Sequence, residues 1–445
     1  MLTEKLNEVL TRVGPGTPMG ELFRRFWLPA LVASEIAEPD SPPKRIRILC
    51  EDLLAFRDSS GKVGIIEAYC SHRLAPLFFG RNEECGLRCP YHGWKFDVNG
   101  KCVDMPNVPN ADSPRVRERG DIRAYPTREA GGLIWVYMGP KELEPPLPEF
   151  EWMGLPEGHC HVSRWLQRTN YSMGMEGEID TAHISFLHKD FDPSKSYLTG
   201  TGADLAEDGA PKLTLRETDY GFTYGARRNM PDGRKFWRQT HWFAPMFSLI
   251  PMIPNEYVGA GGRAWVPIDD DHTTTFSYWF RVDRPLGDGP DLKVLESGAA
   301  FPPRMKPGTF VLPDGGVIDT FLPLANKEND FLIDRDMQRN DNFSGIWGAN
   351  EQDRALQEGM RSVGRKHPGI VDRSKEHLMA SDLAVVTARN KLLKMASDLE
   401  KGIEPACAQS GKSFAVRSIT KICDEDDFDA FVETFKDEIK APSAR

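Results

Sequence analysis

Two short segments of the sequence each place one cysteine close to one histidine. One residue separates Cys70 from His72, two separate Cys89 from His92, and sixteen residues lie between the two pairs. Thiolates and imidazoles bind iron, and in a Rieske-type [2Fe–2S] cluster two cysteines hold one iron while two histidines hold the other. Two loops that each supply one cysteine and one histidine therefore predict such a cluster, with these four residues as its ligands.

A zinc site is the main alternative for these four residues. The usual zinc motif places two cysteines together and two histidines together, whereas here each cysteine is followed by a histidine. Chance is a weak explanation, because only ten histidines and eight cysteines are spread over 445 residues. Cys85, four residues before Cys89, is interpreted as a structural thiol.

A second group of metal-compatible side chains lies in the segment NYSMGMEGEIDTAHISFLH, residues 170–188. Two histidines and one carboxylate with open coordination positions form the facial triad of ferrous oxygenases. His183 and His188 are five residues apart, so on a regular helix they would point about 140° apart. The helix must therefore end or bulge between them if both bind one iron. Asp180 is placed to accept a hydrogen bond from the other nitrogen of a ligand imidazole.

The third ligand of this iron should be a distant carboxylate, and composition cannot choose it among 66 acidic residues. Asp353, in the segment GANEQDRALQEG, is the candidate. An equally ordinary role for Asp353 is that of a first-turn residue in a helix capped by Asn350. His183 and His188 could likewise be incidental residues of a surface helix. A cluster that donates electrons, however, needs an electron acceptor, and this segment is the best suited to hold an iron that accepts them.

Several arginines cluster in a region with strand-like patterning further along the chain. Arginines that point from a strand into a pocket bind aromatic carboxylates through paired hydrogen bonds. We expect Arg227, Arg228 and Arg238 to bind a substrate in this way. Ordinary surface charge is the open alternative for each of them, because exposed arginine is common.

The elements that must position these residues fall into four stretches of sequence. We expect an N-terminal helical segment over residues 1–40, a β domain with the cluster over 41–150, a catalytic domain over 151–400 and a helical tail over 401–445. Short β-like runs bounded by Gly, Asp and Asn turns characterise the second stretch, and a proline-rich linker ends it. The pattern predicts an α+β protein, in which an all-β domain precedes a larger mixed domain.

Individual elements are also predicted within these stretches. Strand-like runs occur throughout the second stretch and again between residues 212 and 282. Helices are expected over residues 2–13, 166–187, 350–362 and 374–398.

Composition and charge narrow the class of protein. The net charge is −10 and no long basic run is present, which argues against nucleic acid or an anionic membrane as a partner. We find no signal peptide and no apolar stretch long enough to cross a membrane. Eight cysteines in 445 residues are not a disulfide framework, so a cytoplasmic location is expected.

The chain resembles the oxygenase subunits of the phthalate dioxygenase type, in the family of Rieske aromatic-ring-hydroxylating oxygenases, which also includes aryl O-demethylases. The matching segments are TRVGPGTPMGELFRRFW, FGRNEECGLRCPYHGWKFDVNGKCVDMPN, YPTREAGGLIWVYMGP, EGEIDTAHISFLH, EQDRALQEG and IVDRSKEHLMASD. Where the family often has Arg-Gly-Ala after the first cluster histidine, this chain has Arg73-Leu74-Ala75. The likeness is much weaker over residues 200–345, the region that decides the substrate.

The resemblance implies roles for individual residues. The four cysteines and histidines named first would hold the cluster, and His183, His188 and Asp353 would hold a mononuclear Fe(II). Asp180 would link a cluster histidine of one subunit to an iron ligand of its neighbour, and Asn170 would lie close to the iron.

The resemblance also implies a fold, an assembly and partners. The catalytic domain would be a helix-grip fold, an antiparallel sheet with helices. The subunits would form a head-to-tail homotrimer, or a stacked hexamer, because cluster and iron of one chain lie too far apart for fast electron transfer. Electrons from NADH would arrive through a flavin and iron–sulfur reductase or a ferredoxin, and dioxygen would be the co-substrate.

The reaction expected from these features is hydroxylation or oxidative O-demethylation of an aromatic carboxylic acid, similar to phthalate, a chlorobenzoate or a methoxylated biaryl. A neutral aromatic or alicyclic substrate is the alternative within the same chemistry. A Rieske electron carrier without a catalytic iron, or a binding protein that has lost its iron, are the alternatives outside it. The length of the chain and the His183–His188 segment count against the electron carrier, and the presence of His183, His188 and Asp353 counts against the binding protein.

Overall fold

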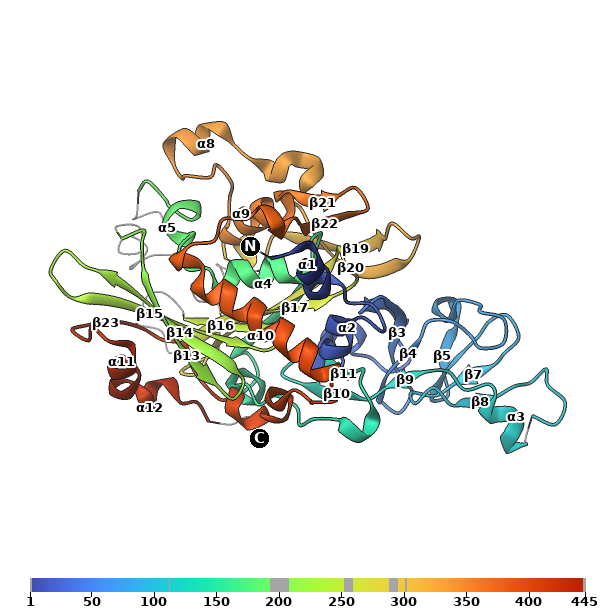
Figure 1. Cartoon of the computed structure of the whole chain (residues 1–445). Coiled ribbons are helices and arrows are strands. Elements are labelled where there is room, and N and C mark those ends of the chain that lie inside the picture. Colours follow the sequence, from blue (N-terminus) through green and yellow to red (C-terminus); the bar gives the residue numbers. More distant parts are fainter. Residues whose placement is uncertain are drawn as a thin grey trace.

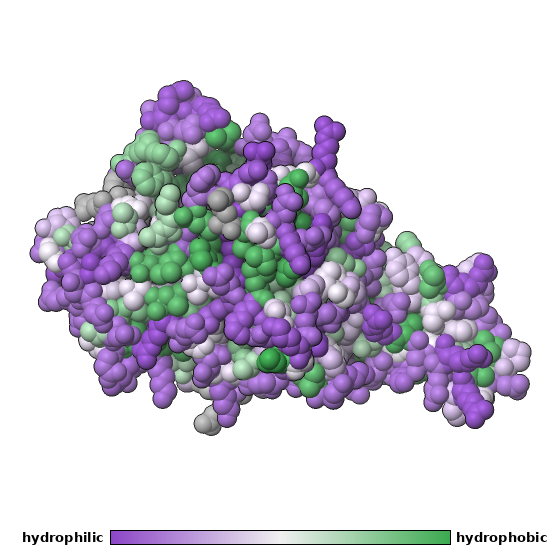
Figure 2. Space-filling model, viewed as in Figure 1, coloured by the Kyte–Doolittle hydropathy of each residue, from purple (hydrophilic) through white to green (hydrophobic). Residues whose placement is uncertain are grey.

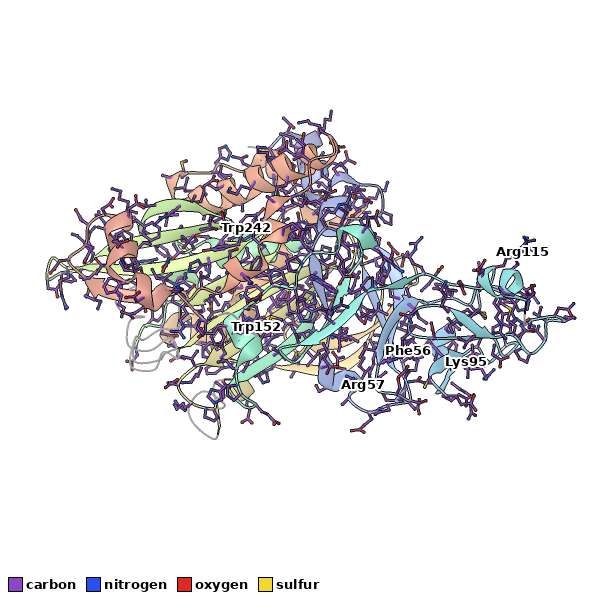
Figure 3. The ribbon with its side chains drawn as sticks, turned by 90° about the horizontal axis from the view of Figure 1, so that it is seen from below. Phe56, Arg57, Lys95, Arg115, Trp152 and Trp242 are labelled. Carbon is purple, nitrogen blue, oxygen red and sulfur yellow. The ribbon has the colours of Figure 1, made fainter. Side chains whose placement is uncertain are left out.

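The computed structural model describes residues 2–111, 113–192, 208–251, 259–287, 295–300 and 302–442. Figure 1 shows a large part built around a twisted sheet and a smaller lobe that projects from one end of it. In Figure 3, Phe56, Lys95 and Arg115 lie in the projecting lobe, whereas Trp152 and Trp242 lie in the large part. Figure 2 shows a mostly hydrophilic face with hydrophobic side chains gathered over the middle of the large part.

The smaller lobe contains two four-stranded antiparallel sheets. The first consists of β2 (Lys44–Ile48), β3 (Glu51–Arg57), β4 (Val63–Glu67) and β9 (Ala124–Tyr125), and the second of β5 (Arg81–Glu83), β6 (Gly86–Arg88), β7 (Lys95–Phe96) and β8 (Cys102–Asp104). Leu54, Phe56, Leu87 and Phe96 are fully buried in one apolar cluster of this lobe. The short helix α3 (Pro114–Glu118) lies near its tip. The lobe therefore has a core of its own.

The large part is built on an antiparallel sheet of eight strands. Seven of them follow one another in the order β12 (Cys160–Gln167), β18 (Thr273–Arg281), β17 (Gly259–Pro267), β16 (Phe247–Pro251), β15 (Lys235–Phe243), β14 (Gly221–Asn229) and β13 (Lys212–Thr218). The eighth, β23 (Thr420–Cys423), pairs with the part of β15 that β16 does not reach. The β-branched and aromatic residues that dominate strands such as β18 favour this arrangement.

Two helices, α4 (Tyr171–Ile179) and α10 (Leu383–Leu399), lie across this sheet in Figure 1. Gly174 lets α4 approach β17 closely, because a Cβ atom at this position would collide with the indole of Trp265. A third helix, α9 (Ala349–Gly359), lies beside α4, where the Gln357 side chain packs against Gly177. The sheet and the helices together form the frame that positions the second metal-compatible group.

The N-terminal helices belong to the core of the large part. They are α1 (Glu4–Thr11) and α2 (Pro18–Phe23). The Tyr171 hydroxyl donates to the Leu10 carbonyl (2.8 Å), and the rings of Phe23 and Tyr171 lie 4.7 Å apart. These contacts tie the start of the chain to α4.

Three strands and a hairpin connect the lobe to the large part. The strands β1 (Trp27–Val32), β11 (Leu133–Tyr137) and β10 (Thr127–Ala130) form one sheet, and β19 (Met305–Val311) pairs with β20 (Val317–Pro323). Arg45 of β2 forms an ion pair with Asp319 of β20 (2.7 Å), and Arg47 forms one with Asp314 in the hairpin turn (2.6 Å).

The α+β architecture expected from the sequence is confirmed, but several elements differ. The helix expected over residues 166–187 begins later, because residues 166 and 167 are the end of the edge strand β12. The tail expected to be helical contributes the strand β23 before its short helices α11 (Phe428–Thr434) and α12 (Lys436–Ile439). Among the described residues, no helix has the length and apolar character needed to cross a membrane.

Candidate metal centres

The two cysteine–histidine segments form loops of the same shape in the smaller lobe. Cys70 donates its backbone N–H to the Ala75 carbonyl (2.9 Å), and Cys89 donates to the Trp94 carbonyl in the same way (2.7 Å). In each loop the fourth residue after the cysteine donates back to the cysteine carbonyl and has a positive φ: +56° at Leu74 and +81° at Gly93. One turn geometry thus presents both cysteine–histidine pairs.

The four side chains of these loops converge. The His72 and His92 rings lie 4.5 Å apart between centroids, and Cys70 and Cys89 are both buried. Burial, together with the neighbouring Cys89 thiol, raises the pKa of Cys70 to about 11. Nδ1 of His72 is buried and has no hydrogen-bond partner among the described residues. Paired thiols and an unpartnered imidazole nitrogen fit a cluster with two sulfur and two nitrogen ligands.

The residues around these loops support them from both sides. The Trp94 ring stacks on His72 at 4.7 Å, and its Nε1 donates to Asn107 (2.8 Å). The Ser71 hydroxyl donates to the Gly120 carbonyl (2.5 Å). Leu74 has the left-handed backbone conformation that glycine adopts most readily, which fits the glycine that the resemblance leads one to expect at this position. Cys85 is exposed in the turn between β5 and β6.

The second group forms where α4 ends. His183 caps the start and His188 the end of the one-turn helix α5 (Ile184–Leu187), which follows the last residue of α4 after a short turn. The helix does end before the two histidines, as their spacing requires. Asp353 comes from the second turn of α9 and completes the group.

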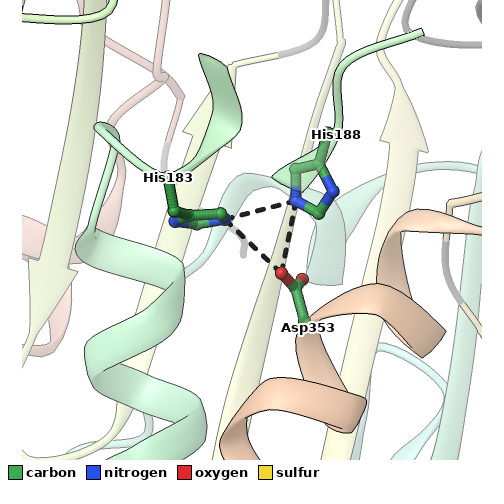
Figure 4. A group of neighbouring side chains, drawn as sticks. All are labelled: His183, His188 and Asp353. Carbon is green, nitrogen blue, oxygen red and sulfur yellow. Dashed lines mark hydrogen bonds and ion pairs between the residues drawn. The ribbon is translucent and has the colours of Figure 1, made fainter. Parts of the chain in front are cut away.

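His183, His188 and Asp353 point their ligand atoms to one centre, as Figure 4 shows. The two Nε2 atoms are 3.2 Å apart, and Oδ1 of Asp353 lies 3.4 Å from Nε2 of His183 and 3.2 Å from Nε2 of His188. An ion near the middle of this triangle would be about 2 Å from all three atoms, the usual metal–ligand distance. The geometry therefore fits a metal held by two histidines and one carboxylate on one side.

Charges around this group favour an ionised Asp353. Burial alone would raise the pKa of Asp353, but His188 and His183 hold it well below its usual range. Burial alone would lower the pKa of His183, but the carboxylates of Asp180, 3.5 Å from Nδ1, and Asp353 raise it to about 10. On the other side, Arg263 of β17 lies 3.7 Å from Oδ2 of Asp353 and forms an ion pair with Glu178.

Comparisons with known proteins agree with both sites. Residues 26–126 match the Rieske [2Fe–2S] domain family, and residues 136–424 match the family described as LigXa C-terminal domain like. The chain is 36% identical to the oxygenase subunit of 3-chlorobenzoate-3,4-dioxygenase from Comamonas testosteroni, with 94% of each chain covered. The chain belongs to the Rieske oxygenases.

Two further relatives are also oxygenase subunits. The oxygenase subunit of phthalate 4,5-dioxygenase from Pseudomonas putida is 37% identical over 90% of this chain and 88% of its own length. The oxygenase subunit of 5,5'-dehydrodivanillate O-demethylase from Sphingobium sp. is 36% identical over 64% of each chain. The enzyme class expected from the sequence, a Rieske non-haem iron oxygenase, is confirmed, and with it the two cofactors of the family, a [2Fe–2S] cluster and a non-haem iron.

Solved structures share the fold of this oxygenase. Dicamba monooxygenase bound to dicamba aligns with a TM-score of 0.57 and 18% identity, over 85% of this chain and 99% of that one. NdmA of Pseudomonas putida CBB5 with caffeine aligns with a TM-score of 0.57 and 16% identity, over 92% of this chain and 99% of that one. At these identities the likeness concerns the fold alone.

Asn170 does not lie where the sequence analysis of this oxygenase expected it. Its side chain caps the start of α4 by accepting from the Ser172 N–H (3.2 Å), and its Nδ2 donates to the carbonyls of Thr11 and Asp270. Since α4 runs from Tyr171 to Ile179, Asn170 lies one helix length away from His183. The structure therefore places Asn170 in a capping role at the start of α4 rather than among the three convergent side chains.

The three arginines of the oxygenase separate into two sets. Arg228 and Arg238 are buried on the face of the sheet that meets the α4–α5 turn, where Arg228 donates to the Thr181 carbonyl (2.8 Å). Arg227 points to the opposite face and forms an ion pair with Asp426. The structure therefore removes Arg227 from the candidate substrate residues.

Residues that the sequence analysis missed also contact the three convergent side chains. Gln352 lies beside His188, and Arg263, which forms an ion pair with Glu178, lies beside Asp353. Gln352 directly precedes Asp353 in the sequence, but nothing in its residue type distinguishes it from other helix residues. Arg263 belongs to a strand whose neighbours in space could not be deduced from the sequence.

Proposed function

We propose that this chain is the oxygenase component of a multicomponent system that hydroxylates or oxidatively O-demethylates an aromatic carboxylic acid. In this proposal Cys70, His72, Cys89 and His92 hold the cluster. His183, His188 and Asp353 hold the Fe(II), which supplies the activation of dioxygen. The finer assignment of the substrate rests on two buried arginines.

Arg228 and Arg238 carry positive charges that no carboxylate side chain neutralises within the described residues. Arg228 is fully buried and donates to the carbonyls of Asp208 and Thr181, and its Nη1 has no partner among the described residues. Arg238 is 4% exposed and donates to the Thr240 hydroxyl (3.3 Å), and its Nε likewise has no partner in the part of the chain that the structure describes. Burial and the nearby Arg238 lower the pKa of Arg228 to about 10.

A buried cation without a counter-ion is costly, since desolvation of one ion amounts to several kcal/mol. An anionic ligand between the two guanidiniums would offset this cost, and a carboxylate fits their planar donor pattern. Thr181, which accepts from Arg228, is two residues from His183. A carboxylate held there would therefore bring an attached ring toward the iron. The substrates named for two relatives, phthalate and 3-chlorobenzoate, are aromatic acids.

The test is single turnover of the reduced, iron-loaded protein with aromatic acids and with their neutral methyl esters. The panel contains phthalates, chlorobenzoates, phenoxybenzoates and methoxylated mono- and biaryl acids, and mass spectrometry identifies the product. Gain of two oxygen and two hydrogen atoms means ring dihydroxylation. Loss of a CH₂ unit with release of formaldehyde means O-demethylation. Turnover of neutral compounds only would overturn the proposed substrate class.

Arginine variants show whether the carboxylate is bound where we propose. Arg238→Met and Arg228→Met should each lower kcat/KM for the acid about 10–100-fold, because a hydrogen bond to a charged group contributes about 1.5–3 kcal/mol. They should leave the methyl ester nearly unaffected. Arg227→Met, one residue away on the opposite face, is the matched control and should leave both reactions unchanged. Equal losses for acid and ester would contradict the carboxylate assignment.

We further propose a head-to-tail homotrimer, or a stack of two trimers. In Figure 1 the lobe with β5 and β7 lies at one end of the molecule and the helix α5 lies near the other, and electron tunnelling falls steeply with distance. Exposed apolar side chains are found near both sites: Leu74 and Phe79 on the lobe are 70% and 69% exposed, and Phe186 on α5 is 57% exposed. Such side chains support contact between copies.

In this assembly Asp180, which lies beside His183 and whose side chain is 29% exposed, would link a cluster histidine of the neighbouring subunit to His183, so that the electron could pass from that cluster to the iron. Subunit mixing tests this arrangement. A Cys89→Ser chain without the cluster and a His188→Ala chain without the iron should recover activity together, but not alone. No recovery after co-folding would contradict transfer between subunits.

The electron donor is proposed to be an NADH-dependent flavin and iron–sulfur reductase, or a ferredoxin reduced by one. We place the protein in the cytoplasm, because eight cysteines in 445 residues are too sparse for a disulfide framework.

A further inference from the structure

One buried amide contacts the imidazole of His188 on the side away from the metal centre. Oε1 of Gln352 lies 2.6 Å from Nδ1 of His188, and Nε2 of Gln352 donates to the Ile346 carbonyl at 2.9 Å. Gln352 is 2% exposed, so water does not compete for these contacts. Because the Ile346 carbonyl can only accept, the NH₂ group must face Ile346 and the amide oxygen must face His188.

This amide orientation decides which nitrogen of His188 carries the proton. An amide oxygen 2.6 Å from Nδ1 requires an N–H on Nδ1. The neutral imidazole then has its lone pair on Nε2, the atom that faces His183 and Asp353. A metal ligand needs its lone pair at this atom, and a hydrogen bond at the other nitrogen also fixes the plane of the ring.

The two histidines are oriented by different chemistry. Nδ1 of His183 faces the carboxylate of Asp180, whereas Nδ1 of His188 faces a neutral amide. Gln352 and Asp353 are adjacent on α9, so one short stretch of helix supplies both a candidate ligand and the partner of a second one.

We propose that Gln352 is a positioning residue that holds His188 in the Nδ1–H tautomer and in the ring orientation required for iron binding. The inference rests on the proposed function, in which His188 is an iron ligand. Gln352 does not touch the metal, so its contribution should be visible in the affinity for Fe(II) before any substrate or dioxygen is present.

The experiment measures the dissociation constant of Fe(II) by competition with a chromogenic chelator, on anaerobic full-length protein with an intact cluster. Gln352→Leu keeps the size of the side chain and removes the acceptor. It should weaken Fe(II) binding about 10–100-fold, the usual effect of losing a partner of a ligand histidine. Gln352→Glu keeps an acceptor opposite Nδ1 and should bind Fe(II) nearly as tightly as wild type. The visible spectrum of the Co(II)-substituted protein should change in the leucine variant and not in the glutamate variant.

Gln357→Leu is the matched control. Gln357 is also a buried glutamine of α9, but its amide oxygen accepts from Gln167 (2.6 Å) rather than from a candidate ligand. This variant should lose thermal stability without losing affinity for Fe(II). Gln352→Met is the alternative acceptor-free variant if leucine prevents folding.

Each outcome decides the inference. Wild-type affinity in an acceptor-free Gln352 variant that folds would overturn it. Equal losses in the leucine and glutamate variants would also overturn it, because the amide would then act only through packing. A wild-type protein that binds no iron beyond the cluster would instead overturn the proposed function, and the inference with it.

Discussion

Gly93→Ala should destabilise the cluster much more than Leu74→Gly, although the two residues occupy equivalent positions in the two ligand loops. Gly93 has a φ of +81°, and a Cβ atom there would lie 2.7 Å from Cγ of Pro106. The left-handed conformation costs a residue with a Cβ atom about 1–2 kcal/mol. Displacement of the rigid proline ring adds about 1–3 kcal/mol. We expect a total loss of about 2–5 kcal/mol.

Leu74→Gly acts in the opposite direction. Leu74 already has a φ of +56°, and its side chain is 70% exposed, so the substitution removes backbone strain and little packing. The flexibility of glycine in the unfolded chain offsets about 0.5–1 kcal/mol of this gain. The net effect should stay within about 1 kcal/mol of wild type.

The assay follows the visible absorption of the cluster during heating and during exposure to an iron chelator. Gly61→Ala is the matched control, because Gly61 has a φ of +83° in the same lobe but open space around its Cα. This control shows the backbone cost alone. If Gly93→Ala loses its cluster no faster than Gly61→Ala, the contact with Pro106 does not matter. If Leu74→Gly loses it as fast as Gly93→Ala, the reasoning from the paired loops is wrong.

Three further predictions concern the second metal centre and the sheet. Asp180→Asn should leave the iron content unchanged and slow electron transfer from cluster to iron about 10–100-fold, as measured by rapid mixing. An unchanged rate of transfer would exclude a path through Asp180. The pKa of His183 is raised to about 10, so Fe(II) must displace a proton from this imidazole when it binds. The affinity of the protein for Fe(II) should therefore rise with pH between about 7 and 9. Fe(II) titrations at several pH values test this, and a flat profile would contradict a protonated His183. Burial lowers the pKa of His241 to about 4, whereas its pKa in the unfolded chain is about 6.5. The stability associated with its neutral form is therefore fully present above pH 6.5 and is lost, by about 3 kcal/mol, as pH falls from 6.5 to 4. His241→Gln should flatten this part of the stability profile in denaturant melts, and an unchanged slope would assign the acid sensitivity to other groups.

The local parts of the two sites could be predicted from sequence, because their ligands are close together along the chain. The cysteine–histidine spacing alone identified the cluster loops, and the five-residue spacing of His183 and His188 required the helix to end, as α4 does. Asp353 could be selected only by resemblance, since a carboxylate from a distant helix leaves no local signal.

Misplaced residues had competing signals in the sequence. Asn170 lies directly before a helix, and asparagine at that position is typical of a helix cap, which is the role that the structure shows. Strand alternation implies that Arg227 and Arg228 face opposite ways, but only the position of α4 shows which of them faces the site. The residues of β12 carry no clear alternation, because one end of this strand is buried on both faces.

The pairing of β23 with β15 affects how the protein can be made. β23 covers the edge of β15 from Lys235 to Arg238, so one of the two proposed carboxylate-binding residues lies on a strand that is completed by residues 420–423. During synthesis the smaller lobe can fold long before residues 420–423 leave the ribosome, and until then the edge of β15 stays uncovered. An uncovered edge recruits strands from other chains. A chain shortened before residue 420 should therefore aggregate during expression while still assembling its iron–sulfur lobe, and brown inclusion bodies would be the visible sign of such a truncation.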